Sequence, residues 1–167
     1  MIKWSQRRKT SRMNKSPEFI GEALGDLFSH WVGFELPGLR QSLGLASLSE
    51  AGRLKAEWEL IVFAAYVLQK LISRRFDDAQ AGPAARGAFM ETALDEELLE
   101  TVKNLMESRL MEYDESPFQE PDGSMGAELC AQLYGHIYMD ESEDDARWEL
   151  LRKAFSALSQ KAQPILS

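Results

Sequence analysis

The chain has 167 residues, a net charge of −8 and one cysteine. This length fits one domain, which can bury enough apolar surface to fold without a metal or disulfide. The single cysteine excludes an intramolecular disulfide framework and a zinc site made of cysteines. Leu and Ala together number 40, whereas the β-branched residues Val, Ile and Thr number 13. Because Leu and Ala favour helices and β-branched residues favour strands, the composition predicts an all-α protein.

The net charge is distributed unevenly along the chain. It is +6 in residues 1–17, −2 in residues 18–90, −15 in residues 91–145 and +3 in residues 146–167. Such segregation is a common sign of an interaction with a charged partner.

The basic N-terminal segment has little apolar periodicity and no helix cap before Ser16. Because chain ends are commonly loose, we expect a disordered basic tail over residues 1–16 and a single helical domain over residues 17–163. The segment lacks the apolar core of a secretory signal, and its amphipathic pattern is poor for a transit peptide. Contact with a polyanion or a membrane surface, with Trp4 as an interfacial anchor, remains an open alternative, as does recognition by a basic-directed kinase.

The first helix is predicted to begin at Ser16, Pro17 and Glu18. A serine N-cap, a proline at the first position and an acid near the positive end of the dipole are typical of a helix start. Gly21 and Gly25 lie four residues apart within this helix, where each costs about 1 kcal/mol relative to Ala. We predict that they let a neighbouring backbone approach closely.

A long apolar helix is predicted to follow. Gly33 and Pro37-Gly38 predict the end of the first helix, and a leucine-rich connector comes next. The S-x-x-E spacing that begins at Ser47 predicts the start of a helix over roughly 50–76. Every residue in the run 60–68 is apolar, which is typical of a helix at the centre of a bundle and too short for a membrane span.

Turn and capping signals divide the second half of the chain. They predict a break over 77–87, with a turn at Gly82-Pro83, and then helical structure from Ala84 to Tyr113, which is either one helix or two helices separated by a cap within Thr92–Asp95. A loop over 114–123 and a helix carrying Met125 to Ile137 follow. The last helix is predicted to be capped by Ser142 and Asp145 and to end at Pro164. We therefore expect about five main helices around the helix 50–76, with no solenoid repeat.

The two histidines lie at helical spacing from carboxylates. Glu22, Asp26 and His30 form one stripe, and His136 and Asp140 form another. If the two stripes faced each other, they would suit zinc, iron or manganese. The Glu-x-x-His motif of di-iron bundles is absent, however, and such pairs are typical of solvated helix surfaces. We assign no metal ligand and no cofactor, and we keep a helical-bundle metalloprotein or small-molecule-binding enzyme using His30 and His136 as the alternative hypothesis.

No catalytic motif is present. The sequence contains no G-x-S-x-G elbow, no Walker A sequence and no G-x-G-x-x-G loop. Cys130 lies in a helical pattern typical of an inert buried thiol, and the acidic string 140–145 lacks the glycine and glutamate of an EF-hand loop. Glu57 and Glu59 point in different directions on a helix, so they cannot act on one substrate atom. Catalytic and cofactor-binding residues stay unassigned, and the pattern favours a protein that is not an enzyme.

The leading hypothesis is a cytoplasmic, non-catalytic helical module for protein–protein interaction, of an adaptor, regulatory or chaperone-like kind. Its acidic region 91–145 would bind a partner with a basic surface, since electrostatic attraction raises encounter rate and specificity. Self-association, with the basic tail of one copy on the acidic region of another, is a second possibility. The acidic region would repel nucleic acid, which we do not expect as a partner, and we expect no transmembrane segment.

Overall fold

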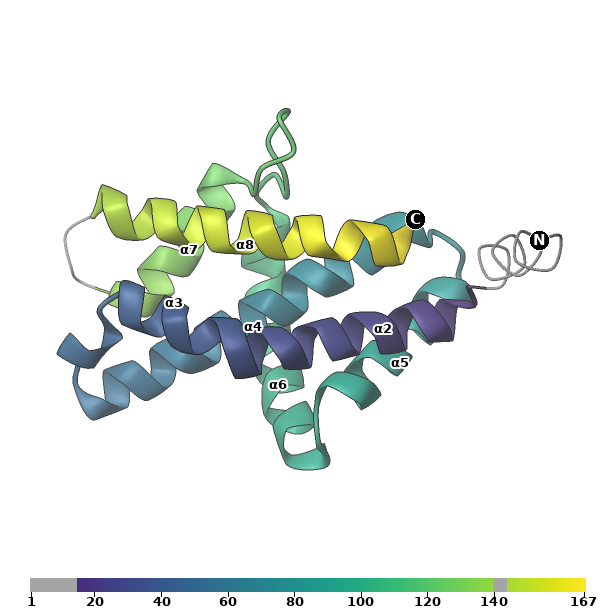
Figure 1. Cartoon of the computed structure of the whole chain (residues 1–167), viewed down its shortest axis with the longest axis horizontal. Coiled ribbons are helices and arrows are strands. Elements are labelled where there is room, and N and C mark those ends of the chain that lie inside the picture. The colour runs from purple at the N-terminus through teal and green to yellow at the C-terminus, as the bar shows by residue number, and fades with distance from the viewer. Residues whose placement is uncertain (1–14, 140–143) are drawn as a thin grey trace, which may run out of the picture.

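Helices form every regular element in the part of the chain that the computed structural model describes, residues 15–139 and 144–167 (Figure 1). The prediction of an all-α domain is confirmed. Among the described residues, six α-helices have twelve or more residues, against about five expected. In chain order the elements are α2 (Pro17–His30), the π-helical turn η1 (Trp31–Glu35), α3 (Leu36–Ser42), the 3-10 turn η2 (Leu45–Ser47), α4 (Glu50–Arg75), α5 (Ala81–Ala93), α6 (Glu96–Asp114), α7 (Ala127–Tyr138) and α8 (Asp145–Leu166).

The long helix α4 lies at the centre of the bundle, as its apolar sequence predicts. All of residues 62–68 are buried, and α4 packs against α2, α5, α6, α7 and α8. Its start differs from the prediction. Ser47 lies in η2 and donates to the carbonyl oxygen of Gly44, whereas Ser49 accepts from the backbone N–H of Gly52, 3.1 Å away, and is the N-cap. Either serine suits a cap locally, and tertiary packing of the preceding connector selects the second.

The first helix does not end at Gly33 or Pro37-Gly38. It continues through the π-helical turn η1 into α3, where Pro37 occupies the first turn. The helical path ends at Gly44, which adopts a φ of 69°. That left-handed conformation is easily reached only by glycine.

Local signals in the second half place most helices correctly, with three boundary corrections. Gly82-Pro83 lies in the first turn of α5, where Asp78 accepts from the N–H groups of Gln80 and Ala81. Pro164 lies inside α8, which continues to Leu166. The helix predicted from Met125 begins at Ala127. Asp95 accepts from the N–H of Leu98 and caps α6, so α5 and α6 are separate helices. The predicted cap Ser142 lies outside the described residues.

Helices α2 and α5 lie side by side along much of their length (Figure 1). A Cβ added at Gly21 would lie 2.1 Å from the carbonyl oxygen of Ala85, and one added at Gly25 would lie 2.7 Å from the Cβ of Thr92. The predicted close approach of a neighbouring backbone at these two glycines is therefore confirmed.

The two ends of the described chain meet at one end of the bundle (Figure 1). The Lys15 ammonium lies 3.3 Å from the carbonyl oxygen of Pro164 and 3.2 Å from that of Ser167. Lys15 and Ser16, at the end of the segment predicted as a tail, are thus part of the folded body, while residues 1–14 lie outside the described residues. None of the helices described is long and apolar enough to cross a lipid bilayer.

Candidate functional site

An apolar groove lies where η1 meets α4 and the corner between α5 and α6. Its volume is about 220 Å³. Its main apolar lining residues, which we call the Trp58 groove, are Phe28, Val32, Trp58, Ile61, Leu94 and Leu98. They come from three chain segments that are distant in sequence, 28–32, 58–61 and 94–98, so only the tertiary fold brings them together.

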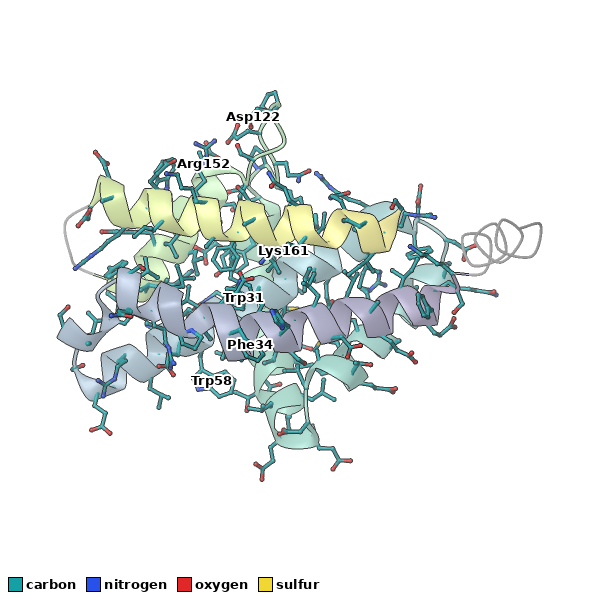
Figure 2. All side chains as sticks on the ribbon, in the orientation of Figure 1. Trp31, Phe34, Trp58, Asp122, Arg152 and Lys161 are labelled. Carbon is teal, nitrogen blue, oxygen red and sulfur yellow. The ribbon has the colours of Figure 1, made fainter. Side chains whose placement is uncertain are left out.

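The π-helical turn shapes one wall of this groove. Residues three apart on an α-helix share a face, but here Trp31 is 2% exposed and packs against Phe155, while Phe34 is 75% exposed. The wider turn of η1 therefore directs Trp31 into the core and Phe34 to the surface. Figure 2 shows Phe34 and Trp58 on the side of α2 that faces away from α8. π-Helical turns are rare, and they occur frequently at functional sites.

Exposed apolar side chains extend the groove onto the surface. Leu54, one turn before Trp58 on α4, is 58% exposed, and Leu98 is 40% exposed. Contiguous apolar surface of this kind commonly marks a binding site, whereas single exposed apolar residues do not. Leu98 connects the groove to the first turn of α6.

Unpaired carboxylates surround that turn of α6. Six exposed acids belong to the end of α5, the α5–α6 corner and α6, and none lies within ion-pair distance of a basic side chain in the described part of the chain. We call them the α6 carboxylates: Glu91, Asp95, Glu96, Glu97, Glu100 and Glu107. They give the region beside the groove a strong negative charge.

Other acids of the region 91–145 have partners inside the protein. Glu112 Oε2 lies 2.9 Å from His136 Nε2, and Asp114 Oδ1 lies 3.0 Å from Lys70 Nζ. Asp114 also accepts from the hydroxyl of Tyr66. The structure therefore pairs only some acids of this region: Glu115, Glu120 and Glu128, like the α6 carboxylates, have no ion pair among the described residues.

The acids flanking Trp58 diverge, as the helical spacing predicts. Glu57 pairs with Arg40 of α3 at 2.6 Å. Glu59 is 3% exposed and accepts two hydrogen bonds from Arg109 of α6, at 2.6 and 3.2 Å. Sequence reasoning missed this buried ion pair; its only signal was an acid directly before the apolar run 60–68.

The Glu59–Arg109 pair shifts the titration of its neighbours. The hydrogen bond that Arg109 donates to Glu59 raises the pKa of Arg109, so the guanidinium is charged at every working pH. Burial, followed by the charge of Glu59, raises the pKa of Tyr113, whose buried hydroxyl has no hydrogen-bond partner among the described residues. This cluster joins α6 to the central helix.

The two histidines occupy different surroundings. His30 is exposed and stacks on Phe34, with ring centroids 4.7 Å apart. His136 pairs with Glu112 of α6, and Asp140 lies outside the described residues. Within residues 15–139 and 144–167, no group of three or more His, Cys, Asp or Glu side chains could hold a metal ion. The described geometry thus offers no support for the metalloprotein alternative.

Cys130 is predicted to resist alkylation in the native protein. It is fully buried in α7, and burial raises the pKa of its thiol to about 12. Near about pH 8 only roughly one thiol in ten thousand is then a thiolate, which is the reactive form. We expect no iodoacetamide adduct by mass spectrometry in the folded protein and complete modification in denaturant. Rapid alkylation of the native protein would contradict this burial.

Comparison with known proteins gave no match: no family model fits the chain, and neither a curated protein nor a solved structure is significantly similar to it.

Proposed function

We propose that this protein is a non-catalytic interaction module that binds a basic, amphipathic segment of a partner protein in the Trp58 groove. The observation that carries the proposal is an open apolar groove directly beside the α6 carboxylates. A helical segment with apolar anchors on one face and lysine or arginine on its flanks matches both features.

The groove and the carboxylates contribute differently to binding. Burying one leucine-sized anchor stabilises a complex by about 1.5–3 kcal/mol. Exposed charge pairs add less than about 1 kcal/mol each and are screened by salt. Apolar contacts therefore set the dissociation rate, while the α6 carboxylates raise the association rate at low ionic strength.

A synthetic peptide provides the test. The probe is a lysine-rich amphipathic helix with leucines at i, i+3 and i+4 spacing, followed by fluorescence polarisation. We expect Leu98→Ala to weaken binding about tenfold, because Leu98 lines the groove, is 40% exposed and supplies an apolar contact worth roughly 1.4 kcal/mol. Met111→Ala is the matched control, since Met111 is 81% exposed on α6 and does not line the groove. Neither substitution should change the thermal midpoint.

Charge variants separate the electrostatic contribution. Replacing Glu96, Glu97 and Glu100 by Gln should slow association and flatten its salt dependence. Glu18→Gln/Glu22→Gln is the control, because Glu18 lies ten residues before Phe28 along α2, or about 15 Å. Peptide binding that is unchanged in both Leu98→Ala and the α6 variant would overturn the proposal. Because residues 1–17 carry +6, a second copy of the chain is a possible source of the basic segment, which light scattering would show as salt-sensitive dimers.

A further inference from the structure

A second pocket, which is lined by two arginines, lies between the C-terminal ends of α4 and α8. Its volume is about 400 Å³. Its polar lining consists of Arg74 and Arg75 of α4, Gln119 of the loop after α6, and Gln163 and Ser167 at the end of the chain. None of the described residues that line it has a carboxylate side chain. We call it the Arg74–Arg75 pocket, and it shares no residue with the Trp58 groove.

Both guanidinium groups are held in place. Arg74 Nη1 donates to Gln119 Oε1 at 2.9 Å, and its guanidinium lies 4.7 Å from the ring centroid of Phe118. Arg75 Nε donates to the carbonyl oxygen of Leu166 at 2.9 Å. A planar guanidinium that is already oriented loses little side-chain entropy when it binds a ligand.

Each arginine also keeps unused donors. Among the described residues, Nε and Nη2 of Arg74 and both Nη atoms of Arg75 have no hydrogen-bond acceptor, and neither side chain is paired with a carboxylate. A helix C-terminus favours nearby arginines through its dipole, which explains one role of the pair. It does not account for a pocket of this size that two arginines with unused donors line.

The charge balance at this end of the bundle favours an anion. The Lys15 ammonium lies 3.5 Å from the main-chain oxygen of Ile165 and 3.2 Å from that of Ser167, and it adds a positive charge here. The C-termini of α4 and α8 each contribute roughly half a negative charge. The two positive charges of Arg74 and Arg75 outweigh this contribution.

We infer that the Arg74–Arg75 pocket binds a phosphate group, either inorganic phosphate or a phosphate monoester such as the headgroup of phosphatidic acid. Phosphate oxygens match the fork geometry of two guanidinium groups, and such charge-assisted bonds are roughly twice as strong as neutral ones. The side-chain amide of Gln163 and the hydroxyl of Ser167 supply further polar contacts at the rim.

Titration with inorganic phosphate tests this inference on the full chain. Two-dimensional ¹H–¹⁵N NMR of the arginine Nε–Hε groups should show saturable shifts that chloride at equal ionic strength does not produce. Arg74→Gln/Arg75→Gln should weaken phosphate binding at least about tenfold, because both positive charges and their guanidinium donors are lost. Arg53→Gln is the matched control, since Arg53 is an exposed arginine near the other end of α4.

Two further measurements make the result decisive. Arg75→Lys keeps the positive charge but not the fork, so it should bind phosphate with intermediate affinity, and circular dichroism shows that each variant is folded. Co-sedimentation with phosphatidylcholine vesicles, with and without phosphatidic acid at about one lipid in five, identifies the source. If the protein sediments with phosphatidic acid vesicles, and if this requires both arginines and is reversed by free phosphate, the ligand is the lipid headgroup. If the protein binds phosphate but does not sediment with the vesicles, the ligand is a soluble phosphate. Shifts that chloride reproduces, or that survive Arg74→Gln/Arg75→Gln, overturn the inference.

Discussion

Replacing Gly21 by alanine is expected to destabilise the fold by about 3 kcal/mol, although alanine is the better helix former by about 1 kcal/mol. The added Cβ would lie 2.1 Å from the carbonyl oxygen of Ala85 and 3.0 Å from the Cβ of Ala88. Because the Cβ would clash with a backbone carbonyl and not with a flexible side chain, the clash can be relieved only if α2 and α5 move apart along their whole contact. That movement opens the core around Leu24 and Phe89, both fully buried.

Urea denaturation followed by circular dichroism measures this effect. Gly87→Ala in α5 is the matched control, because a Cβ at Gly87 meets nothing within 4 Å. It should stabilise the protein by about 0.5–1 kcal/mol through helix propensity and a restricted unfolded state. The stability of Gly25→Ala should lie between those of Gly21→Ala and Gly87→Ala, since the closest contact of its added Cβ is the Thr92 side chain. A Gly21→Ala protein as stable as Gly87→Ala would refute the close packing of α2 on α5.

Replacing Arg109 by methionine should destabilise the protein by about 3–5 kcal/mol, because it leaves the buried carboxylate of Glu59 without its counter-charge. Glu59 lies on the central helix and is 3% exposed, and Arg109 supplies both of its hydrogen bonds. Removing one partner of such a pair costs more than the pair itself contributes. Chemical denaturation reports the loss as a lower midpoint with an unchanged slope.

The double variant Glu59→Leu/Arg109→Met separates the two contributions. An apolar pair of similar volume should be close to the wild type in stability, or above it. With Arg109→Met costing about 3–5 kcal/mol and the double variant close to the wild type, a double-mutant cycle should yield a coupling energy of about 3 kcal/mol or more. Lys103→Met, on an exposed turn of α6, is the control for losing a cation from the same helix. Equal effects of Lys103→Met and Arg109→Met would contradict the burial of the ion pair.

Local sequence signals predicted those features that depend on neighbours along the chain. The N-cap Ser16 accepts from the N–H of Phe19, the run 60–68 forms part of the central helix, and Gly21 and Gly25 meet a neighbouring helix. Predictions failed where two nearby residues suited the same N-cap position equally well, or where a helix accommodates a proline. Ser47 and Ser49 both suit an N-cap, and Pro164 lies so near the end of α8 that few hydrogen bonds remain to lose.

The sequence by itself determined that this is an all-α protein with segregated charge, because helix propensity and side-chain ionisation are local properties. Only the tertiary structure decided which acids remain uncompensated. Lys70 forms an ion pair with Asp114 and His136 contacts Glu112 from other helices, whereas the α6 carboxylates have no such neighbours in the described part of the chain. The Trp58 groove and the Arg74–Arg75 pocket likewise depend on helices that are distant in sequence, and no periodicity within one helix specifies which faces will meet.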